Sequence, residues 1–214
     1  MIVLGVTGSI GMGKSTVSNM LKDMGIPVHD ADATVHKLLA AGGAGVGPVG
    51  KLFPESVLQD AQGQDFIDRK TLGQIVFGDA EKKKALEQIL HPMVQQDSAA
   101  FRAEMEHKGH KLVVFDIPLL FETGGEKRVD AVLVVTAPAD VQKARVMARP
   151  GMTEERFAHV LAQQIPDAEK RARADYIVTT DISLDDTREQ LKKIVDTIVP
   201  PQKPRAAPPT NGRH

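Results

Sequence analysis

Near the N-terminus, residues 6–16 have the sequence VTGSIGMGKST, which fits the phosphate-binding pattern GxxxxGK[ST]. The short apolar run at residues 2–6 predicts a buried parallel strand, and the spacing of apolar residues after Lys14 predicts one face of a helix. Strand, glycine loop and helix therefore follow one another in the order that a phosphate-binding loop requires. We expect an α/β fold organised around this loop.

Each fixed residue of the loop suits the binding of a compact polyphosphate. Gly8, Gly11 and Gly13 let the main chain approach closely, and the helix N-terminus behind them favours negative charge. Lys14 supplies a mobile positive charge for the β- and γ-phosphates, and the Ser15 hydroxyl is placed to ligate Mg2+. The loop predicts a site for a nucleoside triphosphate with Mg2+. The alternative is an ordinary glycine-rich turn with a surface lysine.

Composition excludes several other classes of protein. The 214 residues are 42% hydrophobic, which suffices for one large domain or a core with insertions. There is no Cys, so disulfides and thiolate chemistry are excluded and a cytoplasmic location is expected. A formal net charge of −1 and the lack of Trp argue against nucleic-acid binding. No apolar run approaches the length of a membrane span, and the N-terminus enters strand and loop directly, so we expect an unprocessed, non-membrane protein.

Acidic residues follow two further predicted strands. The second strand, residues 26–29, is followed by Asp30 and Asp32, and the third, residues 112–116, ends in Asp116. Open α/β sheets bind ligands at this end of their strands. One acid of the first pair is expected to cap the following helix, and the other is a candidate catalytic or ligand residue. Asp116 is a candidate neighbour of Mg2+.

Helical patterns replace strands between these two acidic sites, over residues 33–110. Helices are expected over residues 33–41, 69–77, 80–90 and 92–106. The glycine-rich stretch at residues 42–48 predicts a flexible connector. Such a block has the form of an inserted helical subdomain for a second substrate. His91 within it is a candidate contact, or else marks the boundary before a Pro.

Two short helices around a turn are expected later in the chain. Residues 138–148 predict the first helix, with Arg145 and Arg149 on one face, and Thr153 is expected to cap the second. This arrangement has the form of a lid that closes over a triphosphate and excludes water. A solvated basic face is the alternative.

The remaining segments complete the predicted sheet. Strands are expected at residues 129–136 and 176–179, and a last helix is expected to begin at Ser183. The tail at residues 200–214 is rich in Pro and is expected to be disordered. The sequence leaves the oligomeric state open, with a monomer favoured.

Taken together, these segments resemble the dephospho-CoA kinases over nearly the whole chain, to about residue 199. The resemblance rests on the order and spacing of several motifs. They are the loop from Thr7 to Thr16, Asp30-Ala31-Asp32, Leu90-His91-Pro92, the run from Asp116 to Glu122, Gln142 with Arg145 and Arg149, and Gln164 to Asp175. The resemblance implies a P-loop kinase core with a five-stranded parallel sheet flanked by helices, a helical substrate domain and a helical lid. The core would comprise residues 1–32, 111–137 and 168–199, the inserted domain residues 33–110, and the lid residues 138–167.

The resemblance also implies a reaction, the transfer of the γ-phosphoryl group of ATP to the ribose 3′-hydroxyl of dephospho-CoA. Asp32 matches the acid suspected of serving as base, for which an ordinary low pKa is expected to suffice because positioning dominates. Arg145 and Arg149 match lid arginines near the phosphates. The residues implied in nucleotide binding are Gly8, Gly11, Met12, Gly13, Lys14, Ser15 and Thr16. Those implied in acceptor binding are Asp32, His91, Pro118, Leu119 and Glu122, and those implied in Mg2+ binding are Ser15 and Asp116.

One departure from the family pattern lies after the fifth strand, where relatives commonly have Asn and Gly and this chain has Thr180-Asp181-Ile182. Two other functions share the loop. A nucleoside or nucleoside monophosphate kinase is opposed by the inserted domain. A P-loop NTPase switch is less favoured, because the chain has no NKxD motif and its DxxG match at residues 60–63 lies in a polar stretch.

Overall fold

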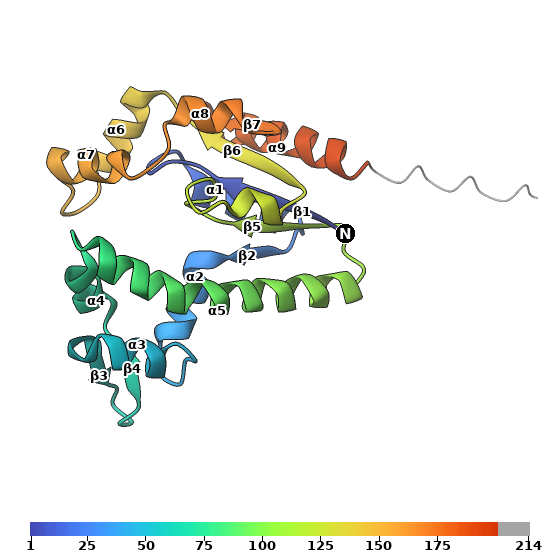
Figure 1. The fold of residues 1–214 in the computed structure, drawn as a ribbon. Coiled ribbons are helices and arrows are strands. Elements are labelled where there is room, and N and C mark those ends of the chain that lie inside the picture. The colour runs from blue at the N-terminus through green and yellow to red at the C-terminus, as the bar shows by residue number, and fades with distance from the viewer. Residues whose placement is uncertain (201–214) are drawn as a thin grey trace, which may run out of the picture.

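The computed structural model describes residues 1–200, so the predicted disordered tail lies outside the described residues except for its first residue. A parallel sheet with the strand order β2-β5-β1-β6-β7 forms the centre of the molecule (Figure 1). Its strands are β1 Ile2–Thr7, β2 Val28–Asp30, β5 Leu112–Asp116, β6 Ala131–Thr136 and β7 Tyr176–Thr179. The predicted five-stranded parallel sheet is confirmed, although β2 begins two residues later than expected.

The parallel register aligns the carboxyl ends of the strands at one edge. Val6 of β1 is in register with Asp116 of β5, which is in register with Asp30 of β2. On the other side, Val6 is in register with Leu133 of β6. Because side chains and loops at the carboxyl ends of such strands face the same crevice, the glycine loop and both acidic sites meet there.

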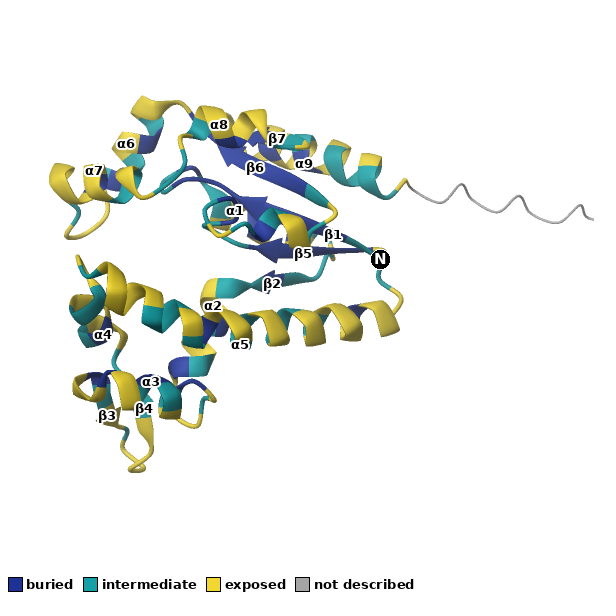
Figure 2. Cartoon of the chain, viewed as in Figure 1, coloured by how far each residue is buried: buried dark blue, intermediate teal, exposed yellow. Residues whose placement is uncertain are grey.

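Helices cover both faces of the sheet. Leu4 and Val6 pack with α1 (Lys14–Asp23) and α9 (Leu184–Ile198), whereas Val3 packs with Met105 of α5 (Ala80–His107) on the opposite face. This alternation follows from the two-residue period of a strand. The inner strands β5, β1 and β6 are almost entirely buried, the edge strands β2 and β7 are partly exposed, and the helices expose their outer sides (Figure 2).

The inserted segment forms a small unit with its own apolar core. Its elements are α2 Ala31–Leu39, α3 Val46–Leu52, β3 Val57–Gln59, β4 Asp65–Ile67 and α4 Arg69–Val76. Its buried residues are Leu39, Val49, Phe53, Ile67, Leu72 and Leu90. The antiparallel pair β3–β4 was not predicted, because each strand has only three residues and no clear alternation.

The prediction of a flexible connector at residues 42–48 is wrong for its second half, where α3 begins. A Cβ atom on Gly43 would lie 2.3 Å from the main-chain oxygen of Leu38, so the chain turns back closely onto the end of α2. The glycine at this position therefore permits a tight contact rather than flexibility.

The predicted boundary at His91-Pro92 is also wrong, because α5 continues through Pro92 as one helix. A Pro inside a helix costs about 3 kcal/mol, since it removes one hydrogen bond and crowds the preceding turn. Packing on both sides offsets this cost: Leu90 lies in the core of the inserted unit, and Phe101 and Met105 pack on the sheet. One helix thus joins the inserted unit to the central sheet (Figure 1).

The helices expected in the lid are present as α6 (Ala139–Met147) and α7 (Glu154–Ala162), followed by α8 (Asp167–Ala172). Thr153 caps α7 as predicted, because its hydroxyl accepts a hydrogen bond from the Arg156 N–H at 3.2 Å. Helices α6 and α7 lie at the carboxyl end of the sheet, on the left of Figure 1. Among residues 1–200, no helix combines the length and apolar character needed to cross a bilayer.

Candidate active site

The glycine loop between β1 and α1 lines a cavity of about 540 Å³. Gly11 and Gly13 have φ angles of 79° and 88°, a conformation that residues with side chains rarely adopt. A Cβ atom on Gly11 would lie 2.5 Å from Cγ2 of Val146 in α6, and one on Gly8 would lie 2.6 Å from the main-chain oxygen of Val135. The loop therefore needs glycines both for its conformation and for its close packing against α6 and β6.

The structure brings together the residues predicted to bind the nucleotide. The cavity is lined by all seven of these loop residues, by the two predicted lid arginines and by Asp32: Gly8, Gly11, Met12, Gly13, Lys14, Ser15, Thr16, Arg145, Arg149 and Asp32. The side chain of Met12 is buried, and its Sδ lies 3.1 Å from the N–H of Ala137. Met12 therefore offers the cavity mainly its main chain, and its side chain anchors the loop to the end of β6.

Asp116 at the end of β5 is buried and contacts two residues of α1. Its carboxylate is ion-paired with the Lys14 ammonium and accepts a hydrogen bond from the Ser18 hydroxyl at 2.7 Å. Ser18 was missed by the sequence reasoning. The available signal was its spacing, since it lies four residues after Lys14 and so on the same helix face.

The oxygen atoms near Lys14 suit a hard cation. Ser15 is exposed at the start of α1, and Asp116 supplies a carboxylate at the adjacent strand end. In the described chain, no three His, Cys, Asp or Glu side chains are grouped to hold a metal. Mg2+ is commonly bound by one or two protein oxygens together with the phosphates of a substrate. The hydroxyl and carboxylate donors fit that type of binding.

Asp30 and Asp32 have different environments. Asp30 caps α2 by accepting a hydrogen bond from the Ala33 N–H at 2.9 Å, so the predicted cap is confirmed. Asp32 lies in the first turn of α2 and lines both the first cavity and a second one of about 1220 Å³. Burial raises the pKa of Asp32; the positive charge of Lys14 opposes this shift, and the neighbouring carboxylates of Asp30 and Asp116 add to it. An ordinary low pKa was expected to suffice for a base at this position, and the buried environment gives Asp32 a raised one instead.

Arg145 reaches from α6 to the segment that follows β7. Its guanidinium donates to the hydroxyl of Thr180 at 2.8 Å and to the main-chain oxygen of the same residue at 2.5 Å. The Thr180 hydroxyl in turn donates to the main-chain oxygen of Met12 at 2.8 Å. Thr180, where the sequence departs from the common family pattern, thus links the arginine to the glycine loop. The sequence reasoning missed this role, although the position of Thr180 directly after a strand was a signal.

The second cavity lies between the inserted unit and α7. His91, Pro118 and Leu119, all predicted to contact the acceptor, line it, and Pro118 and Asp32 also line the first cavity. Its walls include the apolar residues Val76, Leu86, Leu90 and Val94 and the basic residues Lys83, Arg102, Lys127 and Arg128. The basic residues were missed, because they come from separate segments and form no sequence motif.

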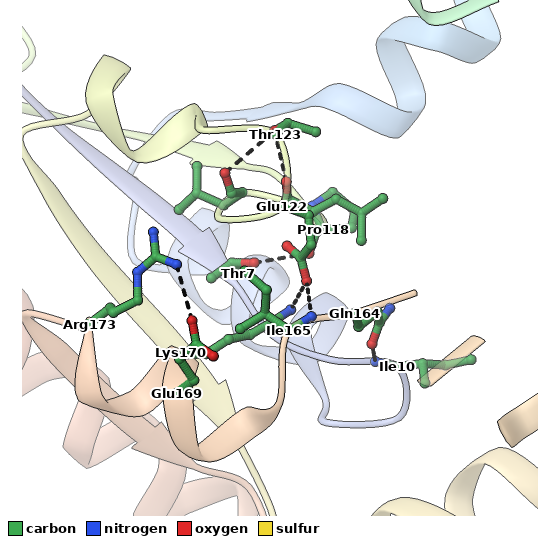
Figure 3. Close-up of polar contacts among 12 residues, drawn as sticks. Thr7, Ile10, Pro118, Glu122, Thr123, Gln164, Ile165, Glu169, Lys170 and Arg173 are labelled. Atoms are coloured by element: carbon green, nitrogen blue, oxygen red, sulfur yellow. Dashed lines mark hydrogen bonds and ion pairs between the residues drawn. The ribbon is translucent and has the colours of Figure 1, made fainter. Parts of the chain in front are cut away.

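Glu122 does not line either of these two cavities. Its Oε1 lies 2.7 Å from Nζ of Lys170, whose side chain is fully buried, and accepts a hydrogen bond from the Ile165 N–H at 2.9 Å (Figure 3). Glu122 thus contacts the segment that follows α7.

Comparison with known proteins identifies relatives that cover most of the chain. The family model described as dephospho-CoA kinase matches residues 2–186. A dephospho-CoA kinase of Novosphingobium aromaticivorans is 53% identical over 198 residues, which are 92% of this chain and 94% of the relative. The solved structure of TT1252 from Thermus thermophilus has a TM-score of 0.76 at 37% identity and covers 92% of this chain and 97% of that one. Dephospho-CoA kinase from Campylobacter jejuni has a TM-score of 0.61 at 29% identity, with coverages of 92% and 96%.

Proposed function

The chain belongs to the dephospho-CoA kinase family, and from this membership we propose that it transfers the γ-phosphoryl group of ATP to the ribose 3′-hydroxyl of dephospho-CoA, the last step of coenzyme A synthesis. It is a kinase of the P-loop class. Family membership favours this function over a nucleoside or nucleoside monophosphate kinase and over an NTPase switch.

One observation carries the proposed geometry of transfer. Asp32 and Pro118 line both cavities, so the two sites meet at these residues. The smaller cavity has the glycine loop and suits the triphosphate. An acceptor hydroxyl that enters from the larger cavity would therefore meet the γ-phosphate beside Asp32. Bringing the two reactants together in this way supplies much of the rate enhancement in phosphoryl transfer.

We propose that Asp32 orients the acceptor hydroxyl and receives its proton. The raised pKa of this carboxylate makes it a better proton acceptor than an ordinary Asp. Lys14, Arg145 and Arg149 line the cavity on the side of the triphosphate and would stabilise the charge that spreads over the transferred group. Lys14 reaches the phosphates by giving up part of its contact with Asp116.

Mg2+ bound with ATP would be held by Ser15 and Asp116, and it would neutralise charge on the phosphates during transfer. Ser18 keeps the carboxylate of Asp116 oriented, because the Ser18 hydroxyl donates a hydrogen bond to one of the two carboxylate oxygens.

The larger cavity suits an acceptor bigger than a nucleoside. Its volume of about 1220 Å³ slightly exceeds the range of about 300–1,000 Å³ typical of small-molecule sites. We propose that its apolar wall binds the pantetheine arm and that Lys83, Arg102, Lys127 and Arg128 surround the diphosphate. In this arrangement residues 33–110 act as the acceptor domain and residues 138–167 as the lid. The cytoplasmic location and the monomeric state stay predictions.

Transfer of labelled phosphate from ATP to dephospho-CoA, AMP, adenosine and pantothenate, measured in parallel, tests the proposal. We expect transfer to dephospho-CoA to be the fastest, and to be lost in Asp32→Asn while ATP still binds. Asp196→Asn is the matched control, because Asp196 lies on α9, lines neither cavity and pairs with the exposed Lys192 at 2.7 Å. Faster transfer to AMP or adenosine would contradict the proposed acceptor, and a fully active Asp32→Asn would contradict the proposed base.

A further inference from the structure

Both ends of the lid contact the same residue of the glycine loop. Gln142 of α6 donates from Nε2 to the main-chain oxygen of Ile10 at 2.8 Å. Gln164, which follows α7, accepts through Oε1 a hydrogen bond from the Ile10 N–H at 3.1 Å. The donor and the acceptor of one loop residue are therefore both bound by side chains of the lid. We call this pair of contacts the Ile10 bridge.

The position of Ile10 makes the Ile10 bridge relevant to the nucleotide. Ile10 lines the first cavity and lies in the turn where the Met12 N–H donates to the main-chain oxygen of Ser9 at 3.2 Å. Gly11 follows it with a positive φ angle and packs against α6. The direction of the next N–H groups toward a phosphate therefore depends on how the main chain at Ile10 is held.

Both glutamines are set in place by other contacts. Gln142 is buried, at 6% exposure. Gln164 is followed by Ile165, whose N–H donates to Glu122 at 2.9 Å, and Glu122 is ion-paired with the buried Lys170 (Figure 3). The lid segment that bears Gln164 is thus fixed to the run of residues that lines the acceptor cavity.

We propose that Gln142 and Gln164 are positioning residues for ATP, which hold the main chain of Ile10 so that the glycine loop is preformed for the phosphates when the lid is in place. The inference rests on the proposed function, because it assigns the triphosphate to this cavity. Gln142 lines neither cavity, and Gln164, which does line the first one, has its Oε1 engaged by the Ile10 N–H. Their effect on the reaction passes through Ile10.

The test replaces each glutamine by Met, which keeps the length of the side chain and removes the hydrogen bond. We expect Gln142→Met and Gln164→Met each to raise the KM for ATP or to lower kcat by about tenfold, as for the loss of a hydrogen bond to a partly buried main-chain group. The KM for dephospho-CoA should stay within about twofold, because Ile10 does not line the second cavity. Gln62→Met, in the turn between β3 and β4, is the control for a Gln-to-Met change at an exposed site.

The double variant separates positioning from general stability. Because both side chains hold the same residue, Gln142→Met/Gln164→Met should be much less impaired than the product of the two single effects. Melting temperatures are measured for all variants, and if Gln142→Met does not fold, Gln142→Asn, whose shorter side chain withdraws the amide from the Ile10 main-chain oxygen, takes its place. Lower melting temperatures with unchanged kinetics for ATP, or an equal rise in the KM of both substrates, would overturn the inference. Absence of transfer to dephospho-CoA by the unmodified enzyme would instead overturn the proposed function.

Discussion

The ion pair between Glu122 and Lys170 gives a sharp prediction about stability. Lys170 is fully buried and Glu122 is 12% exposed, and their Nζ and Oε1 atoms are 2.7 Å apart. The second carboxylate oxygen of Glu122 has no hydrogen-bond partner among the described residues. Both charges have therefore lost most of their hydration, and each depends on the other for compensation.

Removing one partner should cost far more than removing both. Glu122→Gln keeps an oxygen for the Ile165 N–H but leaves a buried ammonium unpaired, so we expect a loss of about 3–5 kcal/mol in the free energy of unfolding. Lys170→Met should cost about 3 kcal/mol, because the remaining carboxylate is slightly exposed and keeps one hydrogen bond. The double variant should lose about 1 kcal/mol or less, since a neutral pair of similar volume replaces the ions. At about 2–4 °C per kcal/mol, the single variants should melt about 6–20 °C below the unmodified protein.

Urea unfolding followed by circular dichroism measures these free energies, with the m-value checked for a two-state transition. The matched control is the exposed pair Glu189–Lys193 on α9, which is 2.8 Å apart with side chains 64% and 73% exposed. Its variants Glu189→Gln and Lys193→Met should each cost about 0.5 kcal/mol or less. Additive losses in the Glu122/Lys170 cycle, or single losses as small as those on α9, would refute the reasoning that burial makes the two charges interdependent.

Three further predictions concern the proposed active site. Lys14→Ala should lower kcat by about 100- to 1,000-fold through loss of a phosphate contact. It should also lower the melting temperature, because the buried carboxylate of Asp116 loses its counter-ion. An unchanged melting temperature would show that this ion pair adds nothing to stability. Asp32→Asn should lower kcat by about 100-fold or more. It should also raise the melting temperature at pH 7, because the raised pKa of Asp32 means that its contribution to folding stability is fully present below the unfolded pKa and is lost as pH rises through the folded pKa. No gain in melting temperature is expected near pH 3, and a lower melting temperature at pH 7 would contradict the burial argument. Arg149→Ala should lower kcat far more than it raises the KM for dephospho-CoA, as measured by steady-state kinetics, and a change in KM alone would place this arginine at the acceptor.

The sequence by itself determined the core of the fold and the class of chemistry. The glycine loop and apolar runs ending in acids predicted the strands, because buried parallel strands are continuous apolar segments and their loops carry the ligand-binding residues. The loop also predicted which residues line the smaller cavity, since glycine spacing and the following Lys14 are local features. A cap from one acid of the Asp30/Asp32 pair followed from the helix after them, and the structure identifies that acid as Asp30.

Only the tertiary structure decided what depends on contacts between distant segments. Helix α5 continues through Pro92 because two separate apolar cores hold it, which no local pattern indicates. Thr180, Gln142 and Gln164 reach the glycine loop from segments more than a hundred residues away. Asp32 has a raised pKa because folding buries it where two cavities meet. Burial and long-range hydrogen bonds are properties of the packed chain, so the sequence predicted the residues proposed to contact the phosphates but not the distant residues that contact the glycine loop.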